Sequence, residues 1–121
     1  VVQAALESVA YRFAEIFDQL DDVCAPREII ASGGALRESP VWTQMIADVL
    51  GRKLTLPSTS EASMRGAVLL ALETTGRISK IEDFPTPPGK QFAASKSRKP
   101  IYAAARKLHQ EAYKLLIDRD K

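Results

Sequence analysis

The fold is constrained most by two short apolar runs that are each followed by a helical pattern. Residues 27–32, Arg-Glu-Ile-Ile-Ala-Ser, form the first run, which ends at Gly33-Gly34. Residues 52–56 form the second, which ends at Pro57. Both runs have the length of buried strands. Because parallel strands need a crossover between them, this order predicts an α/β fold with a parallel βαβ core flanked by helices.

Four helices are expected around this unit. Ser39 is a candidate N-cap, and Pro40 suits the first helical position because its missing N–H has no partner to lose there. The third helix is apolar on several sides and ends before Gly76, so it must be covered on more than one face. The predicted helices span residues 1–20, 39–51, 61–75 and 98–118.

The strands are too few for these helices. Residues 76–97 contain Pro85, Pro87, Pro88 and two glycines with little periodicity, which predicts a surface arm without a regular element. Two strands cannot bury the inward faces of four helices, since sheets normally hold about five strands. The remaining strands are therefore expected to be absent from this chain or supplied by a second copy. The helical pattern begins at Val1 without a methionine, which suggests a piece of a longer protein.

Composition excludes several classes of protein. One cysteine, Cys24, and one histidine, His109, cannot make an internal disulfide or a zinc-ligand set. The net charge is +2, which does not imply a nucleic-acid partner, although residues 90–121 alone carry +6. The longest apolar stretch, residues 67–72, is far shorter than the ~20 residues that span a bilayer. We expect a soluble, cytoplasmic protein without a membrane partner.

The corner at Gly33-Gly34 is the best candidate for a ligand site. Backbone without side chains, placed between a strand and a helix N-terminus, can approach a flat ring or a phosphate closely. The helix dipole would add ~0.3–1 kcal/mol of preference for anions. Taken alone, however, most glycine pairs between a strand and a helix merely make a turn, and capping its own helix is a sufficient reason for Ser39.

Other polar and unusual residues are expected to be structural. Trp42 could stack on a purine, but packing is the more frequent role of such a residue. Gly66 costs its helix ~1 kcal/mol relative to alanine, which predicts close packing at that point. Asp48 is interpreted as structural, Glu61 as a favourable charge at a helix N-terminus, and His109 as solvated.

A series of short strings surrounds the glycine corner and continues into the following helices. They are Ala31-Ser-Gly-Gly-Ala35, Ser39-Pro-Val-Trp42, Gln44, Ala47-Asp48, Gly51-Arg52, Glu61-Ala62 and Arg65-Gly-Ala67. Together they closely resemble the C-terminal domain of the FGGY carbohydrate kinases. The likeness extends to Ile101-Tyr102 and Tyr113, so it covers nearly all of the chain from about residue 27.

The resemblance implies a ribonuclease H-like domain of the actin and sugar-kinase superfamily. In that fold three antiparallel strands precede a helix, strand, helix, strand, helix order, so this chain would be a half-domain that lacks the first three strands. Residues 1–76 would belong to the ATP-binding domain, 77–97 would form a proline-containing arm, and 98–121 would hold the C-terminal helix of the same domain.

The resemblance also implies an ATP site. In this family the Gly-Gly loop lies against the adenosine of ATP, and a small polar residue that starts the next helix contacts the nucleotide. By position these are Gly33 and Gly34, with Ala35 as a backbone neighbour, and Ser39. The family's catalytic aspartate and phosphate loop lie upstream, so no catalytic residue or Mg²⁺ ligand is expected here, and the chain alone should be inactive.

The resulting hypothesis is the adenosine-facing piece of an ATP-dependent kinase that acts on a sugar, sugar acid or polyol. The residues in these motifs most resemble gluconokinase-like and xylulokinase-like members of the family. Their sugar contacts would come from the upstream region. One alternative is a non-catalytic module that forms a homodimer. Another is an actin- or chaperone-type ATPase fragment, against which the Trp42-x-Gln44 and Arg65-Gly-Ala67 strings argue.

Overall fold

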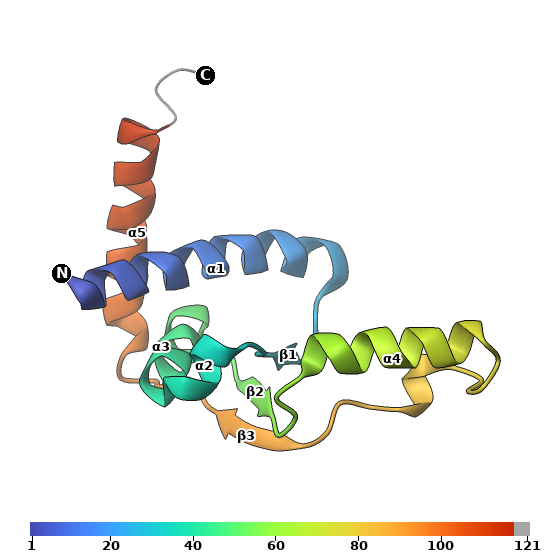
Figure 1. Ribbon diagram of the computed structural model, residues 1–121. Coiled ribbons are helices and arrows are strands. Elements are labelled where there is room, and N and C mark those ends of the chain that lie inside the picture. The colour runs from blue at the N-terminus through green and yellow to red at the C-terminus, as the bar shows by residue number, and fades with distance from the viewer. Residues whose placement is uncertain (118–121) are drawn as a thin grey trace.

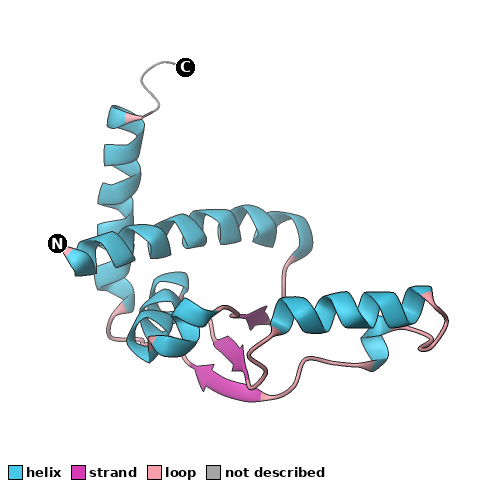
Figure 2. Ribbon diagram, viewed as in Figure 1, coloured by secondary structure: helices cyan, strands magenta, loops and turns pink. Residues whose placement is uncertain are grey.

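The computed structural model describes residues 1–117, which form five α-helices, one 3₁₀-helix and three strands (Figures 1 and 2). The predicted last helix over 98–118 is observed as Lys99–Leu116, and residue 118 lies outside the described residues. The elements are α1 Val2–Cys24, β1 Ile29–Ile30, α2 Gly34–Glu38, α3 Pro40–Leu50, β2 Leu54–Pro57, α4 Ala62–Thr74, η1 Ile81–Asp83, β3 Gly89–Phe92 and α5 Lys99–Leu116.

The sheet contains the predicted parallel pair. Its strand order is β1-β2-β3, with β1 parallel and β3 antiparallel to β2. Ile29 pairs with Leu54 and Ile30 with Thr55, so β1 is only two residues long rather than the six that the sequence predicts. Across the part of the chain that the structure describes, no strand pairs with the outer edge of β1.

The prediction that residues 76–97 lack a regular element is wrong. This segment holds η1 and strand β3, whose register runs from Pro57↔Gly89 to Leu54↔Phe92. Phe92 is 5% exposed and joins the core. The division of the chain at residues 76 and 97 itself stays a prediction.

Helices α1 and α3 pack together over one face of the sheet and enclose the core. Helix α1 continues past the predicted residue 20 to Cys24, and its C-cap, Ala25, has a left-handed φ of 43°. The core is formed by apolar side chains from these two helices, from β2 and β3, and from Ala31 directly after β1. Its buried residues are Ala10, Tyr11, Ala14, Ala31, Met45, Ile46, Ala47, Val49, Leu54, Leu56 and Phe92.

Helix α4 projects from the body of the molecule in Figure 1, and its main packing partner among the described elements is η1. Leu69 is its one buried residue, whereas Met64, Val68 and Leu70 are exposed. The covering that its apolar sequence predicts is therefore not supplied by residues 1–117. The close packing predicted at Gly66 is also wrong for this chain, since a Cβ there would meet nothing within 4 Å.

Helix α5 docks against α1 through aromatic and charged side chains. The rings of Tyr11 and His109 lie 5.3 Å apart, and His109 Nδ1 is 4.0 Å from Glu15 Oε1. The prediction that His109 is solvated is wrong, because only 24% of its side chain is exposed. Burial, followed by the negative charge of Glu7, raises the pKa of both Tyr11 and Tyr102. None of the helices within residues 1–117 has the length and apolarity to cross a bilayer.

Candidate functional site

The glycine corner lies directly beyond the carboxyl end of β1. The Ala31 N–H donates to the Thr55 carbonyl oxygen at 2.9 Å, which extends the pairing of β1 and β2 up to the corner. Gly33 then adopts φ 117° and ψ 151°, a region that only glycine occupies readily. A Cβ at Gly33 or Gly34 would meet nothing within 4 Å. The corner is therefore exposed backbone that this chain's own side chains leave open.

The helix that follows the corner is not the one that the sequence predicts. Gly34–Glu38 form the five-residue helix α2, and the longer α3 begins only at Pro40. Ser39, at φ −124° and ψ 82°, breaks the two apart. Because the dipole grows from many aligned peptides, five residues do not supply the anion preference expected from a full helix N-terminus.

Ser39 acts as a helix cap, as predicted. Its Oγ accepts a hydrogen bond from the Trp42 backbone N–H at 3.3 Å. Ser39 is separated from the corner by the whole of α2, about 7.5 Å of helix. The structure thus groups Gly33, Gly34 and Ala35 at one end of α2 and leaves Ser39 at the other.

Arg37 is a feature of this region that the sequence analysis missed. Its guanidinium donates to the carbonyl oxygens of Pro57 at 2.9 Å, Thr59 at 3.0 Å and Ser58 at 3.4 Å. These bonds join α2 to the loop between β2 and α4. The N-cap of α4 is Glu61, which makes no side-chain capping bond. No spacing in the sequence marks Arg37, because its partners are main-chain atoms about twenty residues away.

Trp42 and Asp48 have structural roles, as predicted. The Trp42 indole N–H donates to the Leu6 carbonyl oxygen at 3.4 Å, and its ring packs against the core. Asp48 is 2% exposed and accepts hydrogen bonds from Gln44, the Ser95 N–H and Arg98. Neither side chain is available to a ligand at the corner.

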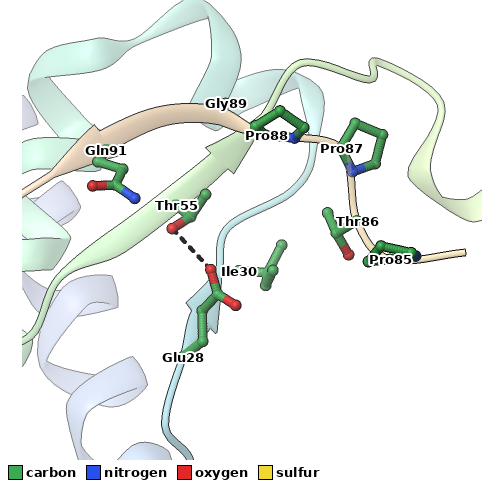
Figure 3. Close-up of a pocket in the computed structure, with 9 residues that line it drawn as sticks. All are labelled: Glu28, Ile30, Thr55, Pro85, Thr86, Pro87, Pro88, Gly89 and Gln91. Atoms are coloured by element: carbon green, nitrogen blue, oxygen red, sulfur yellow. Dashed lines mark hydrogen bonds between the residues drawn. The ribbon is translucent and has the colours of Figure 1, made fainter. Parts of the chain in front are cut away.

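A separate hollow of about 340 Å³ lies on the opposite face of the sheet from α1 and α3 (Figure 3). Thr55 and Glu28 form its polar side, where the Thr55 hydroxyl donates to Glu28 Oε1 at 3.2 Å. Residues 85–88, a threonine among three prolines, form the wall. None of the residues predicted to bind ATP lines this hollow.

Alanine at Gly33 is expected to destabilise the chain by about 2 kcal/mol, because its φ of 117° strains any residue with a Cβ. Gly34→Ala is the matched control, since it adds the same methyl in open space on helical backbone. It should change the free energy of unfolding by less than about 0.5 kcal/mol. Urea unfolding of both variants measures the difference, and equal midpoints would show that the corner is not held in this conformation.

This chain is similar to known carbohydrate kinases. The family model described as FGGY family of carbohydrate kinases, C-terminal domain, matches residues 1–74. The gluconokinase of Bacillus licheniformis is 34% identical over 83 residues, which are 68% of this chain and 16% of that protein. Glycerol kinase 1 of Thermotoga maritima is 35% identical over 85 residues, 69% of this chain and 17% of that protein.

A solved structure extends the likeness to the fold. The xylulose kinase of Rhodospirillum rubrum superposes with a TM-score of 0.76 at 29% identity, over 92% of this chain and 23% of that one. The chain thus spans about a sixth of the curated relatives, at 16–17% of their length. The family match includes β1, the glycine corner, α3 and β2, the elements on which the candidate site is built. The chain belongs to the FGGY family of carbohydrate kinases, of whose C-terminal domain it forms part.

Proposed function

We propose that this chain holds the adenosine of ATP in a carbohydrate kinase that transfers the γ-phosphoryl group to a hydroxyl of its substrate. The open corner at Gly33-Gly34 carries the proposal. It lies outside the carboxyl end of a parallel strand, where ligands of open α/β sheets bind.

The residues at the corner fit a flat, uncharged ring better than a phosphate. A purine nucleoside can lie against Gly33, Gly34 and Ala35 because no Cβ or neighbouring side chain fills the space above the two glycines. The short α2 offers little to a phosphate. ATP supplies the γ-phosphoryl group. In the proposal, Ser39 acts by fixing the start of α3, and the catalytic aspartate and Mg²⁺ ligands belong to residues outside this chain.

The proposal includes a ribonuclease H-like half-domain that three further strands would complete. Its support is the edge of β1 that no strand within residues 1–117 pairs with. Next to this edge, α1 and β1 line an apolar groove of about 320 Å³. Phe13 and Ile16 of α1 are about half exposed there, and Val68 and Leu70 are more than half exposed on α4. Added strands would pair with β1 and cover these side chains.

The substrate is proposed to be a sugar, sugar acid or polyol, of the gluconate or xylulose type. The gluconokinase relative and the xylulose kinase fold support this preference. A cytoplasmic location is part of the same proposal. The apolar groove beside β1 also suits the second candidate, a homodimeric interaction module, in which another copy would cover it.

Titration of the isolated chain with adenosine and with an ATP analogue tests the proposal. Both should shift the amide NMR signals of Gly33, Gly34 and Ala35, with weak affinity, because the contacts are to the nucleoside. A coupled kinase assay should detect no turnover. Turnover by this chain alone would contradict the placement of the catalytic group outside it. If light scattering shows a stable dimer and neither ligand shifts its NMR signals, the interaction module is favoured instead.

A further inference from the structure

We propose that Arg37 is a positioning residue for the nucleotide, which it serves by locking the glycine corner to the loop between β2 and α4. The inference rests on the proposed function, since it concerns the same corner. It adds residues 57–61 as a second side of the nucleotide site, next to the glycine corner that the sequence predicts.

One residue holds both segments. The main-chain N–H of Arg37 donates to the Gly33 carbonyl oxygen at 3.2 Å, which closes the first turn of α2 on the corner. The Arg37 side chain bonds three successive carbonyls, those of residues 57–59. Figure 1 shows that α2 and this loop follow neighbouring parallel strands. Arg37 therefore fixes the separation of the two chain segments that leave the carboxyl ends of β1 and β2.

Helix α2 is too short to hold its place alone, and two ties fix it. The buried Thr43 hydroxyl donates to the Leu36 carbonyl oxygen at 2.8 Å and joins α2 to α3, whereas Arg37 joins α2 to the loop after β2. A helix of five residues is not stable by itself in water, and α2 contains no buried residue. Its one apolar contact with the core is the partly buried Leu36. Hydrogen bonds from a charged guanidinium are stronger than neutral ones, and its planar fork matches several acceptors at once.

The loss of Arg37 should weaken nucleotide binding without removing any contact to the nucleotide. A corner that is already ordered binds without the loss of conformational freedom that ordering would require. We expect Arg37→Ala to raise the Kd for adenosine and for an ATP analogue about tenfold. Arg37→Lys should recover part of this, because an ammonium group can reach one or two of the three carbonyls but not span them.

Arg65 provides a matched control. Its guanidinium also donates to successive carbonyls, those of Phe84 at 2.8 Å and Pro85 at 3.1 Å, but it ties α4 to the segment before β3. Arg65→Ala thus removes the same kind of interaction away from the corner. Hydrogen exchange without ligand should speed up at residues 33–38 and 58–61 together in Arg37→Ala, and at neither segment in Arg65→Ala. NMR titration of the full chain with adenosine measures binding in both variants.

The outcomes separate this inference from the proposed function. If Arg65→Ala weakens adenosine binding as much as Arg37→Ala, or if the corner exchanges normally in Arg37→Ala, the positioning role is wrong while the nucleotide site stands. If the unsubstituted chain does not bind adenosine, the proposed function fails and the role of Arg37 toward the nucleotide fails with it. The inference is supported if Arg37→Ala speeds up exchange at both segments and lowers the affinity for adenosine tenfold, and if Arg37→Lys restores part of that affinity. Arg65→Ala should show neither the faster exchange nor the lower affinity.

Discussion

Alanine in place of Gly89 is expected to lower the free energy of unfolding by about 3 kcal/mol and to detach strand β3. Gly89 lies opposite Pro57 in the antiparallel pair. A Cβ at this position would lie 1.9 Å from the Leu56 carbonyl oxygen and 2.6 Å from the Pro57 Cα. Both atoms belong to the backbone of the central strand, which cannot move aside as a flexible side chain would. The first residue pair of β3 must therefore separate.

Urea unfolding compares this variant with Gly66→Ala, which adds the same methyl where nothing lies within 4 Å. Because Gly66 is inside helix α4, alanine there should stabilise the chain by up to ~1 kcal/mol. The two variants should thus change stability in opposite directions. Loss of amide protection at residues 89–92 in Gly89→Ala alone would identify β3 as the detached element. An unchanged midpoint in Gly89→Ala would contradict the pairing of β3 with β2.

The elements that the sequence predicts are those whose signal is local. Periodic apolar residues located α1, α3, α4 and α5, and two β-branched or apolar runs located β1 and β2. Strand β3, Gly-Lys-Gln-Phe, follows a proline-rich segment and contains no β-branched residue. Its strand conformation comes from pairing with β2, more than thirty residues earlier. Local propensity contains no information on such a contact.

In the candidate site, too, the sequence predicts the features with a local signal and not those that depend on distant contacts. Gly33 and Gly34 are visible in the sequence because a glycine pair between a strand and a helix is a local signal of a sharp corner. Helix α2 was missed since five residues give too short a window for periodicity. The bonds of Arg37 span about twenty residues and those of Asp48 nearly fifty, so neither pattern could be inferred from spacing. His109 was misassigned because its neighbour Tyr11 lies on the distant α1.

Alanine in place of Asp48 is expected to destabilise the chain by about 3 kcal/mol. Asp48 is 2% exposed, and its carboxylate accepts from Gln44 Nε2 at 2.9 Å, the Ser95 N–H at 2.7 Å and Arg98 at 3.1 Å. Through these bonds, α3 holds the turn between β3 and α5. Arg98 can return to water, since 57% of its side chain is exposed. The Ser95 N–H instead loses its acceptor in a partly buried position, which is the larger part of the expected loss.

Two further variants separate the causes of this loss of stability. One removes the charge of Asp48 but keeps a hydrogen-bond acceptor, and the other removes a carboxylate elsewhere in the chain. Asp48→Asn keeps an oxygen that can accept from the Ser95 N–H, so it should lose about half as much stability as Asp48→Ala. Asp22→Ala removes an exposed carboxylate of α1 and should stay within about 0.5 kcal/mol. Hydrogen exchange at Ser95 should accelerate strongly in Asp48→Ala and weakly in Asp48→Asn. Because β3 and α5 are joined through this turn, the protection of the Phe92 and Tyr102 amides against exchange should fall together in Asp48→Ala. If only one of the two amides loses protection, Asp48 does not couple β3 to α5.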